Sequence, residues 1–451
     1  MIPIVTPDEM AAIDAAAPEP LDVLIDRAAA AVARRAVVML GGTYGRRVVV
    51  IAGKGNNGND GRAAALRLRA RGAQVTVFDA SSAPSPLPSC DLVIDAAYGT
   101  GLRRAYAAPL LGAPRPLVLA VDIVSGVDGL TGHARGVLMR ADCTVTFAAL
   151  KPGVLLGDGP ALCGATEVAD LGLDVSRARA HLVEASDVAR WVPPRAIDTH
   201  KWRAAVWVVG GSIGMAGAAR LACGGAMRAG AGYVRLSVPG GHDPGAPTEV
   251  VQVAMATDLV IDAAEAARFG AFVVGPGLGR DAAMGHSLAS FVLGLARPVV
   301  LDGDALTLLG SAGAEVLAGR THSTVLTPHD REFRDLAGVE AGADRMASAR
   351  ALAARCNATV LLKGPTTIVA DPMGKVLVST TGDQRLATAG TGDVLAGIVG
   401  ALLARGIEPL RAAAAAAYLH GVAAQRAPRE AMIASDLLTH LPAVLSSPGD
   451  A

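Results

Sequence analysis

The sequence predicts an α/β protein built from two domains. Short apolar runs alternate with helix-length segments along both halves of the chain, a Pro-Pro pair at 193–194 interrupts this alternation, and Gly-rich loops follow several of the apolar runs. Apolar runs separated by helices are typical of parallel strands in a sheet that is covered on both faces. The length of 451 residues also favours two or three domains over one.

The composition excludes several classes of protein. Hydrophobic residues make up 51% of the chain and charged residues 18%, which excludes an intrinsically disordered protein. Basic and acidic residues number 41 each, so net charge gives no attraction to nucleic acid or to an anionic membrane. Charged and turn residues interrupt every apolar span of about 18 to 20 residues, and residues 1–10 lack a secretory signal. We expect a cytoplasmic protein without nucleic-acid or membrane partners.

The first half begins with an amphipathic, Ala-rich segment over residues 6–40, which we expect to be helical. Apolar, β-branched runs follow, and a helix is expected at about residues 58–71. The expected strands lie within residues 47–53, 73–79, 91–99, 117–126 and 143–150. Because Pro-Pro disfavours helix and keeps the chain extended, we place the end of this first domain at residue 192 and assign it residues 1–192.

The second domain is expected over residues 196–451 and contains more strands than the first. A helix at about residues 215–228 follows its first strand, further helices follow Thr391, and the Ala-rich segment 411–425 has strong helix propensity. The expected strands lie within residues 206–211, 232–238, 271–279, 298–304, 323–329, 358–364 and 366–371. No repeat relates the two halves.

The first Gly-rich loop, GKGNNGNDG at residues 53–61, follows a strand and begins a helix. Gly53, Gly55 and Gly58 match the dinucleotide-binding fingerprint, and Asp79 ends the next strand where a ribose-binding acid could lie, so an NAD-dependent oxidoreductase is one interpretation. That fingerprint requires small residues, whereas this loop also offers amide and carboxylate groups. These belong to Asn56, Asn57, Asn59 and Asp60. Turn and N-cap chemistry would account for one or two of them.

Two further loops follow later strands: AAYGTGLRR after Asp95, and SGVDGLTG, which begins at Ser125 shortly after Asp122. Ligands of open α/β sheets bind at the carboxyl ends of the strands, so these loops could meet the Asn cluster there. The combination of GxGNNGxDG, D…GTGL and DIxSGVD resembles the YjeF N-terminal family of NAD(P)HX epimerases. The resemblance covers about residues 1–190, and the chain departs from the family pattern at Asn59 and Val124.

This first resemblance implies a site for hydrated NADH or NADPH, with Asp122 as the acid/base residue. It implies that Asn57, Asp95 and Ser125 hold a potassium ion, and hard oxygen donors suit a hard cation. The residues implied to contact the hydrate are Asn56, Asn57, Gly58, Asn59, Asp60, Gly99, Thr100, Gly101, Leu102, Arg103, Arg104 and Ala105.

A second candidate site lies in ATAGTGDVLAG at residues 387–397. Gly390 and Gly392 flank Thr391, and Asp393 follows on the first turn of an apolar helix. Backbone N–H groups at a helix start can hold a phosphoryl group, and a nearby carboxylate can take a hydroxyl proton. A helix with an ordinary N-cap would explain the same residues.

Other segments of the second half also end strands and could surround one cleft: GPGLG, VLDGDAL, LTPHDREF and VLLKGPTTIV. Together with GGSIGMAGAARLACGG they resemble the YjeF C-terminal family of ADP- or ATP-dependent NAD(P)HX dehydratases, over about residues 196–445. The two resemblances imply a Rossmann-like three-layer sandwich followed by a ribokinase-like three-layer α/β domain.

The second resemblance implies that Ala218, Gly277, His329 and Asp393 contact the hydrated nucleotide. Asp393 would deprotonate the hydroxyl of the hydrated ring, which then receives the terminal phosphoryl group of ADP or ATP, and Mg²⁺ would bridge the phosphates. Loss of phosphate restores the ring. The residues implied to bind the adenine nucleotide are Lys363, Gly364, Pro365, Thr366, Thr367, Gly390, Thr391 and Gly392.

The sequence therefore predicts a bifunctional repair enzyme that epimerises R and S NADHX and NADPHX and dehydrates the S form. The main alternative is a ribokinase-fold kinase for a small molecule, fused to a non-catalytic domain used for binding or dimerisation, as in relatives that serve as scaffolds in mRNA decapping. We expect a homo-oligomer. An NAD-dependent dehydrogenase fits least well, because the Asn-rich loop does not suit pyrophosphate.

Overall fold

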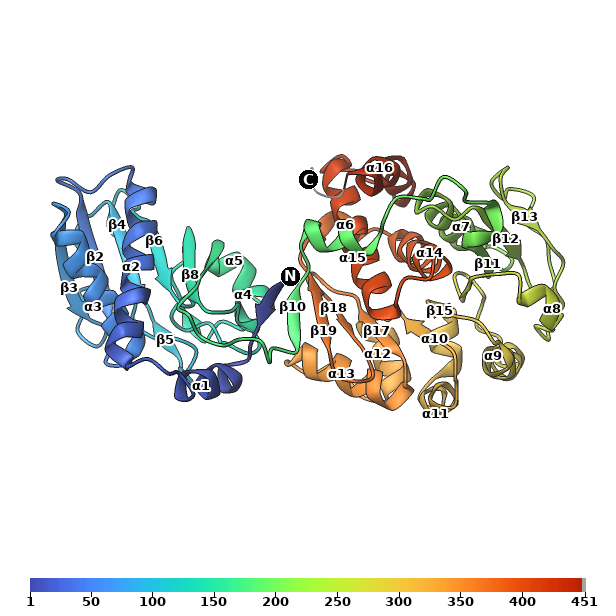
Figure 1. Cartoon of the computed structure of the whole chain (residues 1–451), viewed down its shortest axis with the longest axis horizontal. Coiled ribbons are helices and arrows are strands. Elements are labelled where there is room, and N and C mark those ends of the chain that lie inside the picture. Colours follow the sequence, from blue (N-terminus) through green and yellow to red (C-terminus); the bar gives the residue numbers. More distant parts are fainter. Residues whose placement is uncertain (448–451) are drawn as a thin grey trace. The chain divides into compact units, whose positions relative to one another are not determined.

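The computed structural model describes residues 1–447, so the last four residues of the predicted second domain, 448–451, lie outside it. The chain divides into two compact units (Figure 1). One contains residues 2–179, and the other contains the chain from residue 180 onward together with Met1.

The first unit is built on a six-stranded parallel sheet with the order β3-β2-β4-β6-β8-β9. The strands are β2 (Arg47–Ala52), β3 (Gln74–Asp79), β4 (Leu92–Ala96), β6 (Leu117–Val121), β8 (Cys143–Phe147) and β9 (Ala165–Ala169). All residues of β4 and β8 are buried, as expected for central strands covered on both faces. Two short strands, β5 (Tyr106–Ala107) and β7 (Gly136–Val137), pair separately, and β1 (Ile2–Ile4) precedes the first helix.

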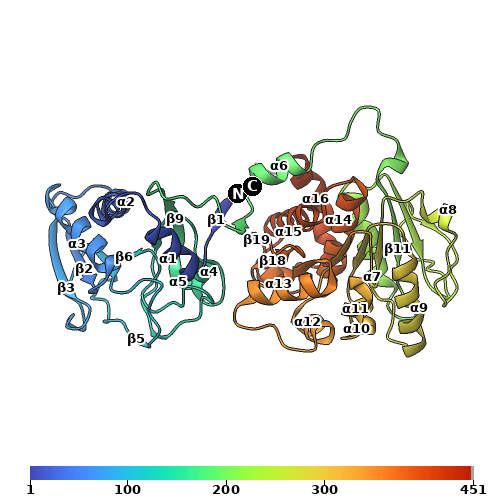
Figure 2. The same cartoon turned by 60° about the horizontal axis from the view of Figure 1, so that its bottom comes forward.

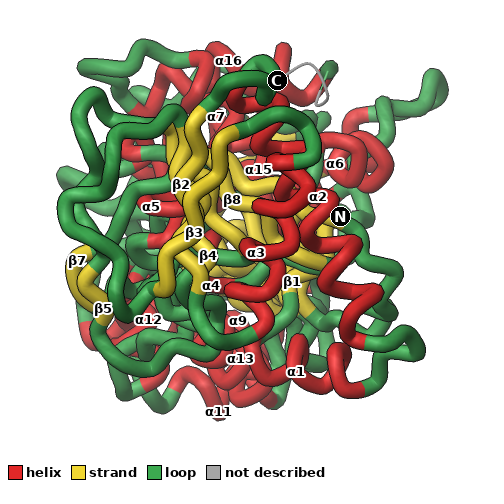
Figure 3. Tube along the Cα trace, turned by 90° about the vertical axis from the view of Figure 1, so that its left-hand side faces the viewer, coloured by secondary structure: helices red, strands yellow, loops and turns green. Residues whose placement is uncertain are grey.

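Two helices cover one face of this sheet (Figure 3). They are α2 (Leu21–Leu40) and α3 (Asn56–Arg69), and their Ala and Leu side chains share one core with alternate residues of the strands. The segment expected to be helical before the first strand forms α1 (Pro7–Ala15) and α2, and two short helices follow β8, α4 (Pro152–Leu155) and α5 (Gly159–Cys163). α1 begins shortly after the end of β1, and α3 begins shortly after the end of β2.

The second unit contains a larger sheet with the order β10-β19-β18-β17-β16-β15-β14-β11-β12-β13. Its pairs are parallel except those made by β18, which is antiparallel to both neighbours. The strands are β10 (Ala180–Leu182), β11 (Ala205–Val209), β12 (Tyr233–Ser237), β13 (Val251–Gln252), β14 (Ala271–Val274), β15 (Val299–Leu301), β16 (Thr324–Leu326), β17 (Thr359–Leu362), β18 (Thr367–Ala370) and β19 (Val376–Ser379).

Helices cover both faces of this sheet, which gives three layers (Figures 1 and 2). One face carries α6 (Ala185–Trp191), α7 (Ala216–Arg228), α14 (Thr391–Ala404), α15 (Pro409–Arg426) and α16 (Ala434–Ser446), which share a large apolar core. The helices of the opposite face are α9 (Ala282–Gly294), α10 (Asp304–Leu309), α11 (Gly313–Ala318), α12 (Asp330–Ala337) and α13 (Arg345–Cys356). Shorter elements are α8 (Ala263–Ala266) and the 3₁₀ helices at Lys201–Ala204 and Gln384–Leu386.

The α/β fold is as predicted, with a parallel sheet in the first unit and a mostly parallel sheet in the second. The units divide after Arg179, earlier than the Pro-Pro pair at which we placed the end of the first domain. Residues 180–191 belong to the second unit because β10 pairs with β19 and α6 packs against α15. The Pro-Pro pair thus lies in a loop inside this unit, between α6 and β11. No helix in the part of the chain that the structure describes is long and apolar enough to cross a membrane.

Candidate active sites

The first Gly-rich loop connects β2 to α3 in a tight turn. A Cβ atom at Gly58 would lie 2.0 Å from the carbonyl oxygen of Gly53, so only glycine fits there. α3 begins at Asn56, which places Asn56, Asn57 and Asp60 on its first turns. Asn59 is exposed and donates its backbone N–H to the Gly55 carbonyl within the helix, so this departure from the family pattern needs no glycine-only backbone conformation.

The predicted acid at the end of β3 is engaged elsewhere. The Asp79 carboxylate accepts a hydrogen bond of 2.6 Å from Arg62, which also donates to the Gly53 carbonyl oxygen at 2.6 Å. Because Arg62 neutralises Asp79 and braces the Gly-rich loop, the structure gives no support to a ribose-binding role for this carboxylate.

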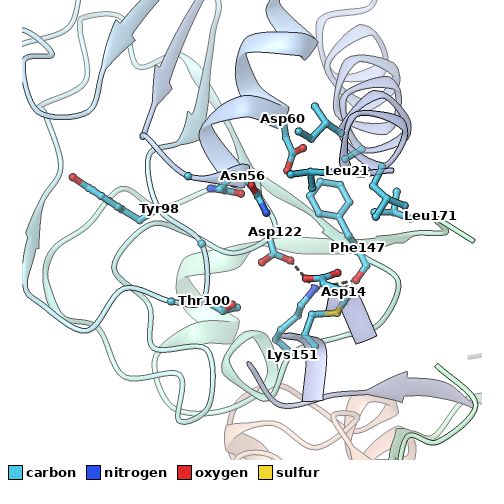
Figure 4. Close-up of a pocket in the computed structure, with 18 of the residues that line it drawn as sticks. Asp14, Leu21, Asn56, Asp60, Tyr98, Thr100, Asp122, Phe147, Lys151 and Leu171 are labelled. Carbon is cyan, nitrogen blue, oxygen red and sulfur yellow. Dashed lines mark hydrogen bonds and ion pairs between the residues drawn. The ribbon is translucent and has the colours of Figure 1, made fainter. Parts of the chain in front are cut away.

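A cavity of about 490 Å³ opens beside the start of α3 (Figure 4). One part of its wall is apolar and comes mainly from α1, α2 and the segment after β9: Met10, Leu21, Leu24, Ile25, Ala28, Phe147, Leu171 and Leu173. The polar part carries Asp14, Asn56, Asn57, Asp60, Tyr98, Thr100, Asp122 and Lys151. A wall of this mixed kind can hold an organic ring and direct polar groups at one side of it.

Asp122 lies at the carboxyl end of β6 and faces this cavity. Its backbone adopts φ +67°, a conformation that Asp tolerates better than most residues. The Lys151 ammonium donates to the Asp122 carboxylate at 2.6 Å, and the Thr146 hydroxyl donates to the same oxygen at 3.1 Å. Lys151 is 1% exposed and also contacts the Thr146 hydroxyl and the Phe147 carbonyl, so its position is fixed by three oxygen atoms.

Sequence reasoning missed Lys151. It follows β8 and precedes Pro152, where a lone lysine would ordinarily be solvated. One feature of the sequence could have indicated Lys151. It follows the buried strand CTVTF, after three intervening residues, and the carboxyl end of that strand lies at the same edge of the sheet as Asp122.

Two of the three predicted potassium ligands, Asp95 and Ser125, are in contact at the carboxyl ends of β4 and β6, and Asn57 lies on the first turn of α3. The buried Asp95 carboxylate accepts from the Ser125 hydroxyl at 2.6 Å and from its backbone N–H at 2.9 Å. Burial raises the pKa of Asp95 above its ordinary value. Both polar side-chain atoms of Asn57 are buried, and neither has a hydrogen-bond partner among the described residues. An amide left in this state requires a partner that the protein itself does not supply.

The loop predicted to contact the hydrate divides into two parts. Gly99, Thr100, Gly101 and Leu102 line the cavity, whereas Arg103, Arg104 and Ala105 are not part of its wall. Arg104 donates to the Tyr98 hydroxyl at 3.1 Å and lies over the Tyr98 ring. Of the predicted residues on α3, Gly58 and Asn59 also lie outside the wall.

In the second unit, Asp393 occupies the first turn of α14. Gly390 precedes the helix with φ +93°, and Thr391 is held by its hydroxyl, which donates to the Leu386 and Thr388 carbonyl oxygens at 2.8 and 2.9 Å. Burial, followed by the negative charge of Asp302, raises the pKa of Asp393 to about 7. A carboxyl group of this kind exchanges a proton near neutral pH beside backbone N–H groups that can hold an anion.

A buried network lies next to this helix start. The Lys363 ammonium contacts Asp302 at 2.9 Å and Glu332 at 3.5 Å, and a Cβ atom at Gly392 would lie 3.3 Å from its nitrogen. Burial acts to lower the pKa of Lys363, but Asp302 and Glu332 raise it above its ordinary value. Gly364, Pro365 and Thr366 form the connection from β17 to Thr367 at the start of β18. Lys363 therefore joins this connection to the start of α14.

The remaining predicted contacts of the second unit lie on different segments: Ala218 on α7, Gly277 in the loop after β14, and His329 at the start of α12. Gly277 has φ +61°, and a Cβ atom there would lie 2.4 Å from the Met215 carbonyl oxygen and 3.1 Å from Ala218 Cβ, so Gly277 and Ala218 are neighbours. His329 caps α12 by accepting from the Glu332 backbone N–H through Nδ1, and the Glu332 carboxylate accepts from the His329 backbone N–H in return. About half of the His329 side chain remains exposed.

Two protein-family models match the chain. The model described as NAD(P)H-hydrate dehydratase matches residues 206–446, which is more than half of the chain, and the model described as YjeF-related protein N-terminus matches residues 21–88 and 78–153. Bifunctional NAD(P)H-hydrate repair enzymes are similar over most of their length. The one from Mycobacterium tuberculosis is 39% identical over 411 residues, covering 85% of this chain and 84% of its own. The one from Escherichia coli is 32% identical, covering 89% and 85%.

Solved structures resemble the second unit. The ADP/ATP-dependent NAD(P)H-hydrate dehydratase from Bacillus subtilis, co-crystallised with ATP and Mg²⁺, is 29% identical with a TM-score of 0.50 and covers 58% of this chain and 96% of its own. A ribokinase-like superfamily protein from Enterococcus faecalis gives a TM-score of 0.51 at 23% identity, covering 60% and 98%, and supports the fold alone.

Proposed function

This chain belongs to the family of bifunctional NAD(P)H-hydrate repair enzymes, and from that premise we propose that residues 2–179 epimerise the R and S hydrates of NADH and NADPH while the second unit dehydrates the S form. The observation that carries this proposal is the similarity to bifunctional relatives over both units together, at 32 to 39% identity. Joining the two activities is chemically sensible because the second step accepts a single epimer.

In the first unit, the proposed substrate cavity is the one that Asp122 faces. Lys151 holds the Asp122 carboxylate at a fixed point of the wall, where it can take or return a proton at the hydrated ring. The apolar wall would exclude water from the ring, and Asn56 and Thr100 offer polar groups for its substituents.

We propose a potassium site at Asn57, Asp95 and Ser125. The fit rests on the buried Asn57 amide, whose oxygen has no partner among the described residues, and on the buried Asp95 carboxylate, a hard oxygen donor. A cation there would compensate the charge of Asp95 and fix the loops that carry Gly99 and Asn57.

In the second unit, we propose that Asp393 takes the proton of the ring hydroxyl while the backbone N–H groups after Gly390 hold the phosphoryl group being transferred to it. ADP would become AMP, or ATP would become ADP. The phosphorylated hydroxyl then leaves as phosphate, which is a far better leaving group than hydroxide, and the ring double bond is restored. This accounts for a dehydration that consumes a nucleotide.

Lys363 and the residues that follow it to Thr367 are proposed to bind the adenine nucleotide, together with Thr391 and Gly392. Asp302 and Glu332 add carboxylate oxygens next to Lys363, a donor set that suits Mg²⁺ carried by the phosphates. Mg²⁺ would neutralise charge on the transferred group. His329, Ala218 and Gly277 are proposed to contact the hydrate. The cytoplasmic location and the homo-oligomer expected from the sequence stay predictions.

The dehydration rate should rise as pH increases through about 7, because Asp393 must be ionised to accept the hydroxyl proton and its pKa is raised to about 7. The measurement is kcat for dehydration of S-NADHX at saturating substrate and nucleotide across this pH range. Residual activity of Asp393→Asn should lack the rise. A wild-type kcat that is unchanged across this range while the chemical step limits the rate would contradict the role of Asp393.

The proposed function itself is tested by supplying purified protein with S-NADHX, Mg²⁺ and ADP or ATP. We expect NADH and free phosphate in equal amounts. A stable phosphorylated product instead of released phosphate would contradict dehydration and indicate a small-molecule kinase.

A further inference from the structure

Four carboxyl groups line the cavity of the first unit, and two of them, Asp122 and Asp60, come from the elements at the carboxyl edge of the sheet. Asp122 follows β6, and Asp60 lies on the second turn of α3 (Figure 4). Their surroundings differ. Asp122 is paired with the Lys151 ammonium at 2.6 Å, whereas the Asp60 side chain is 7% exposed and contacts no cation and no hydrogen-bond donor among the described residues.

The charged groups that face Asp60 are both acidic. They are Asp14 on α1 and Asp122, and burial together with these two charges raises the pKa of Asp60 to about 8. The other charged residues of the wall are committed elsewhere, because Lys151 is fixed by Asp122, Thr146 and Phe147, and Glu19 pairs with Arg27 at 3.0 Å. At neutral pH Asp60 therefore keeps its proton, whereas Asp122 is paired with an ammonium group, and two carboxyl groups in such different surroundings can act as an acid and a base on one substrate.

Epimerisation of the proposed substrate gives a role to a proton donor and to a proton acceptor. Adding water to an enamine double bond places the hydroxyl on the carbon that is bonded to the ring nitrogen, so R and S hydrates differ at a carbon that carries both N and O. Epimerisation at this carbon can proceed by breaking the C–O bond and forming it again on the opposite face of the ring, and this is the route that a proton donor and a proton acceptor would serve. Departure of the hydroxyl requires a proton, and addition of water requires its removal.

We propose that Asp60 is the proton donor and Asp122 the proton acceptor of the epimerisation, and that Lys151 is a positioning residue that keeps these two carboxyl groups in opposite roles. This inference rests on the proposed function of the first unit. It adds Asp60 as a catalytic residue and Lys151 as a residue that acts through Asp122.

Epimerisation by these two carboxyl groups proceeds in two stages. The lone pair of the ring nitrogen forms a C=N bond, the C–O bond breaks, and the departing oxygen takes the Asp60 proton and leaves as water. A water molecule then adds to the opposite face, its proton passes to Asp122, and the C=N electrons return to nitrogen. Asp60 ends ionised and Asp122 protonated, and transfer of one proton between them through water restores the starting state.

The first test is the pH dependence of epimerisation by wild-type protein, measured by separating R and S NADHX without added nucleotide and subtracting the uncatalysed rate. We expect kcat to fall as pH rises through about 8, because Asp60 loses its proton there. A kcat that stays constant above this pH would contradict the proposal, and this test does not depend on a variant folding correctly.

The matched variants are Asp60→Asn and Asp26→Asn. Asp26 is an exposed residue of α2 that pairs with Arg67 and is not part of the cavity wall, so its variant should keep the wild-type rate. Asp60→Asn keeps the shape of the side chain but cannot donate an acidic proton, so kcat should fall by about 100-fold and the decrease above pH about 8 should vanish. Asp60→Glu, which restores an acid, should recover part of the rate together with the decrease.

Lys151 is tested by Lys151→Met and Lys151→Arg. Removal of the ammonium should lower kcat for epimerisation more than it changes KM, and the arginine variant should recover part of kcat because it returns a cation to Asp122. Wild-type kcat in Lys151→Met would overturn the positioning role. If the wild-type protein does not epimerise NADHX, the proposed function of the first unit fails; if it does and Asp60→Asn keeps the wild-type rate and pH profile, this inference alone fails.

Discussion

Asp393→Asn should reduce the dehydration of S-NADHX by about a thousand-fold and leave epimerisation unchanged. The variant keeps the size of the side chain on the first turn of α14, but it cannot accept the proton of the ring hydroxyl. The nucleophile for phosphoryl transfer is then a neutral hydroxyl group. NADH formation, followed by its absorbance, measures the loss.

Asp262→Asn is the matched control. Asp262 is the N-cap residue of the short helix α8, and Asn caps a helix as well as Asp does. We expect wild-type dehydration from it. Asp393→Asn protein should unfold at the wild-type temperature. If it also dehydrates at the wild-type rate, another group accepts the proton.

Asp122→Asn should lower the rate of epimerisation by about a hundred-fold or more while dehydration continues. Asn is preferred to Ala for this test because the residue adopts φ +67°, which Asn tolerates, so the backbone after β6 is preserved. With a mixture of R and S NADHX, Mg²⁺ and ADP, NADH should form rapidly from the S fraction and then only slowly from the R fraction.

The Asp26→Asn protein serves again as the control and should convert both fractions at one rate. Rapid conversion of the R fraction by Asp122→Asn would remove Asp122 from the mechanism. If wild-type protein also converts the R fraction slowly, the first unit is a poor epimerase. Asn59 and Val124, where the chain differs from the family pattern, are then the first residues to substitute.

The sequence was informative where loops follow strands. The alternation of apolar runs and helices predicts parallel sheets, and the carboxyl ends of neighbouring parallel strands meet at one edge, which is why Asp122 and the Asn-rich loop could be placed near each other from the sequence. The same argument predicts that the loop at Gly277 and the helix carrying Ala218 are neighbours.

Side-chain pairing was harder to predict. Lys151 reaches Asp122 because its long side chain points toward the end of β6. The pattern of apolar residues does not show in which direction that side chain points. Asp79 shows the same limit, because its position suggested a ribose ligand and its actual partner is Arg62 on α3. The division of the units after Arg179 depends on the pairing of β10 with β19, two strands far apart in the sequence, which the local pattern does not record.

The products of the complete reaction report on both proposed activities at once. Wild-type protein is added to a mixture of R and S NADHX with Mg²⁺ and ADP, and the NADH, AMP and phosphate formed are quantified until the reaction stops. We predict that the whole mixture returns as NADH, with one AMP and one phosphate for each NADH. Recovery of no NADH with either ADP or ATP would contradict the assignment of the chain as a repair enzyme.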